Sequence, residues 1–216
     1  LNQIMYYKKW YNIKVINNKE TVIIDLKKNL MENYEKRRFY DLKNIEKKNI
    51  LKISKNPLDK KNFIKTYKDN MKKIEANNFY FFSNEYLENI INFDFVDTWF
   101  VYMNKKVVSA AIILNSKKSK VVEYFLGARD FNYDKYKSTV YLLHKISEHY
   151  KNENYHKFYL GGGRSASDDD TLLFFKKGFS GFTSDFYIAH KIYDNKTYYD
   201  LKKKTNSLNE PKILFY

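Results

Sequence analysis

The sequence predicts an α+β fold with a mixed, mainly antiparallel sheet flanked by helices. Three apolar segments of strand length follow one another in the middle of the chain, and segments with helical periodicity lie on both sides of them. A helix after the third strand leads to a fourth strand, which allows one parallel pair in the sheet. The 216 residues are enough for one sizeable core, so we expect one principal active site.

The N-terminal part is expected to begin with a β-hairpin. Tyr11–Ile16 and Thr21–Leu26 are rich in β-forming residues, and Asn17-Asn18-Lys19 between them can supply the positive φ of a tight turn. Leu26–Lys48 then has helix-forming composition. It predicts one long charged helix, or two helices that meet near Arg37-Arg38.

A short strand and two helices are predicted next. Ile50–Ser54 has the composition of a strand, and Pro57 fits the first turn of a following helix. Phe63 and Tyr67 begin an apolar face at helical spacing in that helix. Ser83 is a candidate N-cap for another short helix.

The rest of the chain alternates between strand and helix patterns. Tight turns separate the three central strands, which predicts an antiparallel meander. The expected elements, in order, are strands at Val96–Met103, Val107–Leu114 and Lys120–Gly127, a helix at Lys135–Tyr150, a strand at Lys157–Leu160, a helix at Thr171–Lys177, a strand at Thr183–Tyr193, a helix at Asn195–Lys204 and a closing strand at Lys212–Tyr216.

The chain is strongly basic, with 40 Lys and Arg against 25 Asp and Glu and a formal net charge of +15. Such a charge attracts nucleic acids, anionic membranes and phosphate-bearing ligands. However, Lys, Asn, Ile and Tyr are abundant together, and all four have A/T-rich codons, so genome composition explains much of the excess. The lysines are also scattered, which favours a solvated surface over a nucleic-acid site.

Several classes of protein are disfavoured by what the sequence lacks. It has no Cys, which excludes disulfides, thiolate metal sites and cysteine nucleophiles. No apolar stretch approaches the roughly 20 residues that span a bilayer. Lys8 and Lys9 follow the first apolar residues instead of preceding a long apolar region, unlike a signal peptide. We expect a cytoplasmic protein, with a peripheral position at the inner membrane face as an alternative.

Gly161, Gly162 and Gly163 end the strand that follows the long helix. Three consecutive glycines lose much backbone entropy on folding, so we expect a positive φ, a close backbone approach or an anion-binding nest at this point. The segment fits neither the G-x-G-x-x-G fingerprint nor the phosphate-binding loop that ends in Gly-Lys-Ser/Thr. After it, Arg164 offers donors, and Asp168-Asp169-Asp170 is expected to cap the next helix in preference to binding a metal.

The order of these motifs resembles the FemAB-like branch of the GNAT acyltransferase superfamily. The resemblance rests on a strand ending in Leu160-Gly-Gly-Gly163, an acidic turn, a helix with Phe175-Lys176 and then Gly178-Phe179, and a terminal strand followed by Tyr198-Tyr-Asp-Leu201. It covers most of the chain and implies a GNAT-like domain at residues 27–216. Residues 1–26 would then be the tail of a preceding GNAT-like domain, and we expect further residues before Leu1.

The resemblance also implies an activity, the transfer of an acyl group from an activated donor to an amine. Lys176 matches the family position that stabilises negative charge on the carbonyl oxygen, with Phe175 packed beside it. Without the resemblance, Lys176 has the pattern of a solvated helix lysine next to Lys177. His190, near the glycine segment in the family arrangement, is a candidate general base.

The substrate-binding residues expected beside Lys176 and Phe175 fall into two groups. Gly161, Gly162, Gly163 and Arg164 form the first, at the glycine segment. The second lines the groove for the acceptor, where a phenol can donate to a substrate carbonyl, and consists of Tyr80, Tyr86 and Tyr124.

The donor and the acceptor stay open. The resemblance implies acyl-CoA or aminoacyl-tRNA as donor, and a small-molecule or glycan-linked amine of the cell envelope as acceptor, with tRNA as a partner in the second case. Phe82 stands where relatives that recognise a peptidoglycan precursor carry an arginine. Gly127-Ala-Arg-Asp-Phe-Asn132 does not reproduce the pyrophosphate loop typical of acetyl-CoA-using relatives.

Two further possibilities concern metal binding and the binding of an anionic polymer. The four histidines form no H-x-x-x-H or H-E-x-x-H pair, so we expect no metal. A non-catalytic GNAT-fold module that binds RNA or another anionic polymer through its positive surface is the alternative to an enzyme, and it predicts binding with a steep dependence on salt.

Overall fold

A computed structural model describes residues 13–58, 61–164 and 169–208. The chain divides into a larger compact unit, Glu20–Ser184, and a smaller one formed by Leu1–Lys19 with Asp185–Tyr216. The strands β1 (Lys14–Asp25) and β7 (Thr183–His190) have residues in both units. Whether the first 26 residues are the tail of a preceding domain stays a prediction, and the closing strand at Lys212–Tyr216 lies outside the described residues.

The described strands form one seven-stranded sheet in the order β2-β3-β4-β5-β6-β1-β7. Every strand pair with a described register is antiparallel except β5 and β6, which are parallel. This confirms the predicted mixed, mainly antiparallel sheet. Besides β1 and β7, the strands are β2 (Lys52–Lys55), β3 (Val96–Met103), β4 (Lys106–Ser116), β5 (Val121–Arg129) and β6 (Lys157–Gly162).

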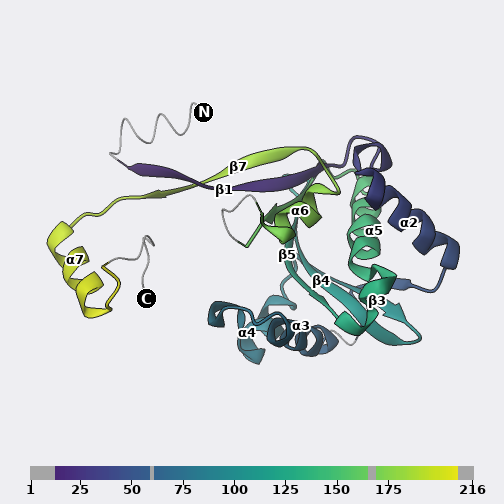
Figure 1. Ribbon diagram of the computed structural model, residues 1–216, viewed down its shortest axis with the longest axis horizontal. Helices are drawn as coiled ribbons and strands as arrows, with labels where there is room; N and C mark the ends of the chain where they lie inside the picture. The colour runs from purple at the N-terminus through teal and green to yellow at the C-terminus, as the bar shows by residue number, and fades with distance from the viewer. Residues whose placement is uncertain (1–12, 59–60, 165–168, 209–216) are drawn as a thin grey trace. The chain divides into compact units, whose positions relative to one another are not determined.

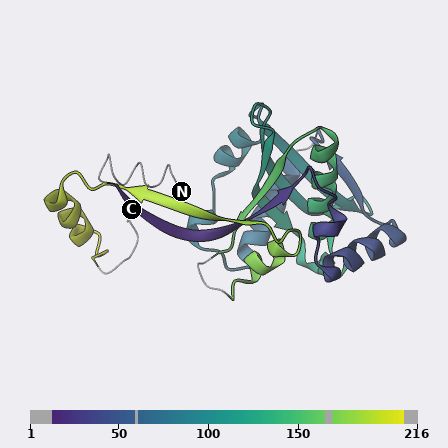
Figure 2. The same ribbon diagram turned by 90° about the horizontal axis from the view of Figure 1, so that it is seen from above.

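Helices cover both faces of the sheet in the larger unit. Figure 1 shows α2 and α5 on one face of β3 to β5 and α3 and α4 on the other, and Figure 2 shows α2 and α5 at the same end of this unit. The helical elements are η1 (Met31–Asn33), α2 (Lys36–Lys48), α3 (Lys61–Lys73), η2 (Asn78–Tyr80), α4 (Asn84–Ile90), η3 (Phe131–Tyr136), α5 (Ser138–Asn152), α6 (Thr171–Lys177) and α7 (Asn195–Lys204), the last in the smaller unit.

The core has two halves because the central strands are apolar on both sides. All residues of β3 from Val96 to Val101 are buried, as expected for a strand with helices above and below it. Leu42 of α2 and Leu143 of α5 belong to the cluster on one face. Phe63 of α3 and Leu87 of α4 belong to the cluster on the other.

The predicted N-terminal hairpin is wrong in the described residues. Asn17, Asn18 and Lys19 lie inside the continuous strand β1 and form no turn. β1 lies between β6 and β7 in the sheet order, so it has a neighbour on each edge. The hydrogen bonds of a central strand outweigh the weak turn preference of the two asparagines.

The predicted junction near Arg37-Arg38 is also displaced. The break falls at Tyr34 and Glu35, between η1 and α2. Tyr34 is buried with its ring 5.3 Å from that of Phe179, and the Glu35 amide donates to the carbonyl of Gly178 at 3.1 Å. Contacts with a distant segment therefore decide where the helix begins.

Left-handed backbone positions are mostly occupied by side chains other than glycine. Asn49 ends α2 at a φ of 48°, and Lys137 precedes α5 at a φ of 54°. Such positions normally favour glycine, of which the chain has six. In the described residues they are Asn49, Asn56, Glu75, Asn104, Lys105, Lys120, Lys137, Asn154 and Asn206, with Gly161 as the glycine example.

Candidate functional site

The parallel strands β5 and β6 stay paired only at their beginnings. Their described register ends at the pair Glu123 and Tyr159. Beyond it, β6 continues along β1, where Gly162 pairs with Thr21. The carboxyl end of β6 is therefore held on the β1 side while the ladder with β5 has stopped. A strand end of this kind, after a parallel pair, is where α/β folds commonly place ligands.

Irregularities in β5 and β6 mark the same region. Two residues of β5, Tyr124 and Leu126, pair with consecutive residues of β4, which leaves Phe125 as an extra residue. In β6, Leu160 is the extra residue opposite β1. Gly161 follows with a φ of 75°, so the predicted need for a left-handed glycine is confirmed at this position. β-Bulges are frequent beside active sites, because they redirect side chains.

Gly163 is required by a close approach of a carboxylate. A Cβ at this position would come within 2.5 Å of the Asp170 side chain. Asp170 is buried and accepts from the backbone amides of Leu172 and Leu173 at 2.9 Å each, and from that of Arg164 at 2.6 Å. The predicted capping role is confirmed for Asp170. Through these hydrogen bonds, Asp170 connects the end of the glycine segment to the start of α6.

Lys176 points from α6 to the glycine segment. Its side chain is buried, and its Nζ donates to the carbonyl oxygen of Gly162 at 2.7 Å. A Cβ on Gly161 would lie 3.6 Å from the same Nζ. Lys177, the neighbouring lysine, instead pairs with Glu20 of β1 at 2.5 Å, and its side chain is 39% exposed. Of the two adjacent lysines, Lys176 is therefore the one directed to the glycines.

Arg38 holds the far end of α6 and was not anticipated from the sequence. Its Nη2 donates to the carbonyl of Phe175 at 3.2 Å, and its guanidinium lies 4.7 Å from the Phe175 ring centre and 4.9 Å from that of Phe179. Burial lowers the pKa of Arg38. A Cβ on Gly178 would come within 2.9 Å of the guanidinium. In the sequence, Gly178 is the feature that could have indicated this contact, because a glycine leaves room for the guanidinium.

Tyr124 lies in the bulged part of β5. Its hydroxyl occupies the space in which a Gly127 side chain would stand, because a Cβ there would come within 1.6 Å of the oxygen. Burial raises the pKa of Tyr124 to about 12. The phenol is protonated at neutral pH, as an ordinary tyrosine is, and can donate a hydrogen bond. Tyr124 and Phe175 pack against the same core cluster, on the face covered by α2 and α5.

Tyr80 and Tyr86 lie on other elements, Tyr80 at the end of η2 and Tyr86 within α4. The carbonyl of Tyr80 accepts from the Tyr67 hydroxyl at 3.0 Å, and the Tyr86 ring lies 4.8 Å from that of Phe82. Both side chains are exposed. Their predicted part in an acceptor groove stays a prediction. His190, at the end of β7, belongs to the smaller unit, and its assignment as general base likewise stays a prediction.

A second buried charge in the larger unit has a different environment. Asp97 of β3 accepts from Tyr150 at 2.5 Å, Asn56 at 2.7 Å and Asn115 at 3.0 Å, and its carboxylate lies 3.3 Å from the Lys55 Nζ. Burial opposes ionisation of Asp97, but these hydrogen bonds and the nearby lysine hold its pKa below the ordinary range. All its described partners are side chains that enclose it.

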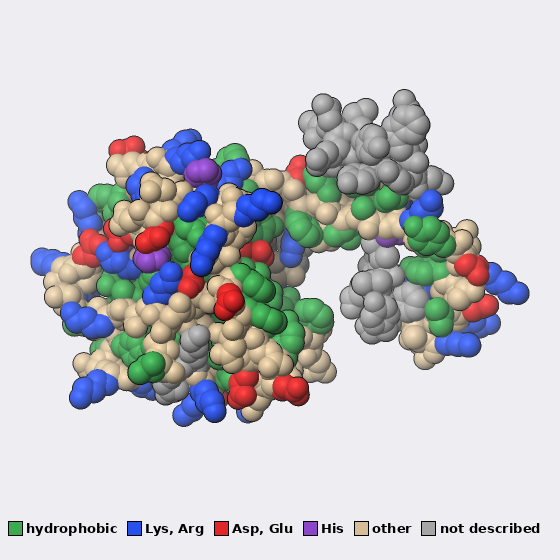
Figure 3. Space-filling view, turned by 180° about the vertical axis from the view of Figure 1, so that it is seen from behind, with side chains coloured by type: hydrophobic (Ala, Val, Ile, Leu, Met, Phe, Trp, Pro, Cys, Tyr) green, Lys and Arg blue, Asp and Glu red, His purple; other side chains and the backbone are tan. Residues whose placement is uncertain are grey.

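The remaining features bear on metals, membranes and polymers. Among the described residues, no group of three or more His, Cys, Asp or Glu could hold a metal ion. Within the same ranges, no helix combines the length and apolarity that crossing a bilayer requires. On the face drawn in Figure 3, Lys and Arg side chains of the larger unit are spread among acidic and neutral ones and form no continuous band.

Comparisons with known proteins show the fold. No protein-family model and no curated protein matches the sequence. Among solved structures, FemX matches with a TM-score of 0.73 and 12% identity, over 92% of this chain and 70% of that one. L-PGS from Bacillus licheniformis matches with a TM-score of 0.66 and 13% identity, over 90% of this chain and 66% of that one. This chain thus spans about two thirds of the length of both proteins.

A smaller acetyltransferase shares part of the architecture. It is an aminoglycoside acetyltransferase from an uncultured soil metagenomic sample, solved in complex with sisomicin. It matches with a TM-score of 0.52 and 17% identity, over 68% of this chain and 97% of its own. At these identities the likeness is one of fold. The sheet order, the parting of β5 and β6 and these three matches agree, and the chain has a FemAB-like GNAT fold.

Proposed function

We propose that the chain is an N-acyl or aminoacyl transferase that moves an acyl group from an activated donor to an amine acceptor. The observation that carries the proposal is the Lys176 Nζ, buried and 2.7 Å from the Gly162 carbonyl oxygen, at the edge where β6 has parted from β5. The fold shared with FemX, L-PGS and an acetyltransferase supports it.

The reaction needs a positive charge near the acyl carbonyl. The acceptor nitrogen attacks the carbonyl carbon, and the carbonyl oxygen gains negative charge as the C–N bond forms. The bond from the carbonyl carbon to the leaving group then breaks; this is a sulfur in acyl-CoA and an ester oxygen in aminoacyl-tRNA. The proton lost by the amine is transferred to that sulfur or oxygen. The Lys176 ammonium supplies the stabilising charge in a site that limits water, where a preoriented donor is most effective.

Other residues position the lysine and the substrates. Asp170 fixes the start of α6 and Arg38 its end, so the helix that carries Lys176 is held at both ends. In the proposal, the glycine segment lets a substrate approach the backbone closely. Phe175, which precedes Lys176, packs against Arg38 and Phe179. In the proposal, Tyr124 donates a hydrogen bond to a bound substrate, and His190 remains the candidate base.

The donor is acyl-CoA or aminoacyl-tRNA, and the acceptor is a small-molecule or glycan-linked amine of cell-envelope synthesis. The glycan-linked acceptor rests on the FemAB-like fold and not on a motif in this chain. We expect the reaction to take place in the cytoplasm or at the inner membrane face.

The test compares two adjacent lysines. Purified chain is given a panel of acyl-CoA and aminoacyl-tRNA donors with amine acceptors, and product formation is followed by mass spectrometry. Lys176→Ala should lower kcat about 100- to 1,000-fold, the loss expected when one oxyanion donor is removed. Lys177→Ala, which breaks only the pair with Glu20, should change kcat little. If Lys176→Ala and Gly162→Val both keep full activity with an identified substrate pair, the site assignment is wrong.

The same samples test the alternative of a non-catalytic module. The affinity for each donor is measured from low to high salt. If an acyl donor binds selectively and its affinity changes little with salt, the result contradicts the proposal of a non-catalytic module. If the affinity falls steeply with salt and is the same for every polymer, the result contradicts the proposal of an enzyme.

A further inference from the structure

Glu123 lies at the point where β5 and β6 part, and the proposed reaction assigns it no role. Its pairing with Tyr159 is the last described pair of the parallel ladder. The side chain is half-buried, and within residues 13–58, 61–164 and 169–208 it has neither a hydrogen bond nor an ion pair. A carboxylate that is partly withdrawn from water normally has a donor or a cation beside it. An unpaired one at a strand edge therefore indicates a partner from outside.

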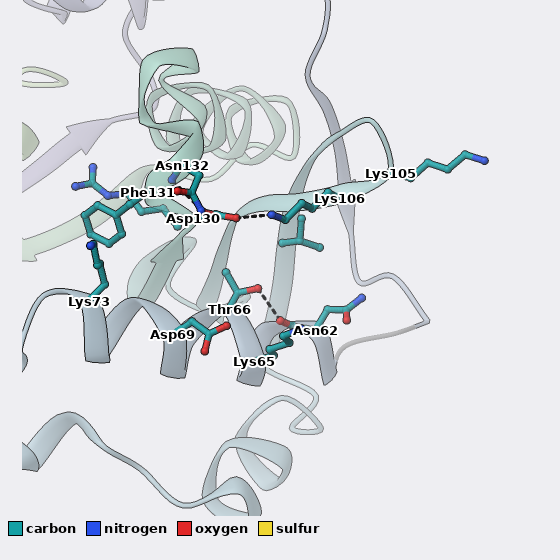
Figure 4. Close-up of a pocket in the computed structure, with 12 residues that line it drawn as sticks. Asn62, Lys65, Thr66, Asp69, Lys73, Lys105, Lys106, Asp130, Phe131 and Asn132 are labelled. Atoms are coloured by element: carbon teal, nitrogen blue, oxygen red, sulfur yellow. Dashed lines mark hydrogen bonds and ion pairs between the residues drawn. The ribbon is translucent and has the colours of Figure 1, made fainter.

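The carboxylate at the other end of β5 is paired. Asp130 directly follows the strand, at the hollow beside α3 that Figure 4 draws, and its carboxylate lies 2.8 Å from the Lys106 Nζ. Burial opposes ionisation of Asp130, but the bond with Lys106 holds its pKa below the ordinary value. Burial raises the pKa of Glu123. Of these two carboxyls, Glu123 is the one whose charge the protein leaves uncompensated.

Glu123 faces the side of the sheet covered by α3 and α4. Side chains alternate along a strand, and its neighbours Val122 and Tyr124 belong to the core on the side of α2 and α5. Its partner in β4, Leu114, packs against the core under α3 and α4. Tyr86, which is expected in the acceptor groove, lies in α4 on this same side. The carboxylate is thus on the side from which the acceptor is expected.

Tyr159 connects Glu123 with the lysine of the proposed site. The residues before and after Tyr159 belong to the core on the side of α2 and α5, so its side chain shares the face of Glu123. Paired residues of neighbouring strands lie about 5 Å apart. On the other side, a Cβ on Gly161 would lie 3.9 Å from the Tyr159 Cε1 and 3.6 Å from the Lys176 Nζ. One tyrosine therefore has the carboxylate and the ammonium group as near neighbours.

From this arrangement we propose that Glu123 is a specificity-determining residue that binds an ammonium group of the acceptor, and that the acceptor is a diamine or polyamine. The inference rests on the proposed acyl transfer. One acceptor nitrogen, in its neutral form, attacks the acyl carbonyl beside Lys176. A second nitrogen stays protonated and donates to the Glu123 carboxylate, in a charge-assisted hydrogen bond that fixes the orientation of the acceptor. It forms no covalent bond and loses no proton, so the balance of the transfer is unchanged.

Binding of a diamine can be measured without acyl transfer. The full chain is titrated with putrescine, and with butanediol as an uncharged analogue of the same length, and binding is followed by ligand-observed NMR. Mildly alkaline pH keeps the carboxylate ionised and the alkylammonium groups protonated. Glu123→Gln keeps the shape of the side chain and removes its charge. Glu153→Gln, at an exposed position after α5, gives the same net charge and is the matched control.

We expect the wild type and Glu153→Gln to bind putrescine in preference to butanediol, and Glu123→Gln to bind putrescine about tenfold more weakly. Three results overturn the inference: no binding of putrescine by the wild type, equal binding of butanediol, or equal affinity for putrescine in the two variants. Thermal unfolding checks that both variants are folded.

In the transfer assay, Glu123 should act on KM. Glu123→Gln should raise the KM for putrescine about tenfold and leave kcat near the wild-type value, whereas both constants for the monoamine butylamine should change little. A loss of kcat with an unchanged KM contradicts a role in specificity. Binding of putrescine that depends on Glu123, without transfer to any amine, retains the ammonium site and contradicts the transferase. Transfer without such binding contradicts only this inference.

Discussion

Asp97 and Lys176 are both buried charges of the larger unit, but their surroundings differ in kind. Asp97 lies near the start of β3, the strand next to the edge strand β2, and side chains from several elements enclose its carboxylate. Lys176 lies on a seven-residue helix and donates to a backbone carbonyl at the end of a bulged strand. An enclosed charge is tied to the stability of the fold, whereas the proposed role of Lys176 requires a substrate to reach its ammonium group.

The largest expected effect comes from removing the enclosed charge. Asp97→Ala leaves Lys55 and three donors without their acceptor, so the free energy of unfolding should fall by about 3–5 kcal/mol. Urea unfolding followed by circular dichroism measures it. Asp94→Ala, at an exposed position just before β3, is the matched control and should stay within about 0.5 kcal/mol of the wild type. If Asp97→Ala and Asp94→Ala lost equal free energy of unfolding, the enclosed carboxylate would contribute no more to stability than the exposed one.

A smaller loss is expected at the glycine segment. Gly163→Ala brings a methyl group within 2.5 Å of the Asp170 carboxylate, which must shift and weaken the cap of α6. We expect about 1–3 kcal/mol less stability in urea unfolding. Gly181→Ala is the control, because a Cβ there meets nothing within 4 Å. In a double-mutant cycle, Gly163→Ala should cost clearly less in an Asp170→Ala background, and full additivity would show that the two residues do not interact.

Gly161→Ala should have a milder effect on stability than Gly163→Ala. The strain arises from the φ of 75°, since the added Cβ would lie at an ordinary distance of 3.6 Å from Lys176. The expected decrease is about 1 kcal/mol, measured in the same unfolding assay against Gly181→Ala. Stability like that of the control would mean that the strand end relaxes to a negative φ.

The smallest expected effect is the decrease of the free energy of unfolding at acidic pH. The folded pKa of Asp97 lies below its unfolded value, so its ionisation contributes stability that is complete above the unfolded pKa and disappears as pH falls through the folded one. The free energy of unfolding of the wild type should therefore decrease below about pH 4. Asp97→Asn should lack this part of the decrease, and Asp94→Asn should retain it. A wild-type curve that superimposes on that of Asp97→Asn would contradict the assignment.

Elements with strong local signals could be predicted from the sequence. The predicted bounds of β3, α6 and α7 agree with the structure. The apolar run of β3 indicates a buried strand, and the side chains of Asp170 and Asp194 cap the two helices. In these places local sequence and tertiary packing favour the same structure.

Features that depend on distant partners could not be predicted. The continuity of β1 follows from its place between β6 and β7, and the start of α2 follows from the contact with Gly178. The pattern of α6 gives Lys176 and Lys177 the same weight, and only the fold directs Lys176 to Gly162 and Lys177 to Glu20. The role of Lys176 in catalysis remains a proposal, as does that of His190.

The left-handed turns that carry Asn, Lys and Glu have a consequence for how this protein can change. A Lys in the left-handed region, such as Lys137, holds about 1 kcal/mol of strain that a glycine would release. Glycine codons are rich in G, which a genome with A/T-rich codon usage supplies rarely. A single glycine substitution at such a position, for example Lys137→Gly, should therefore offset about 1 kcal/mol of a destabilising change in the core.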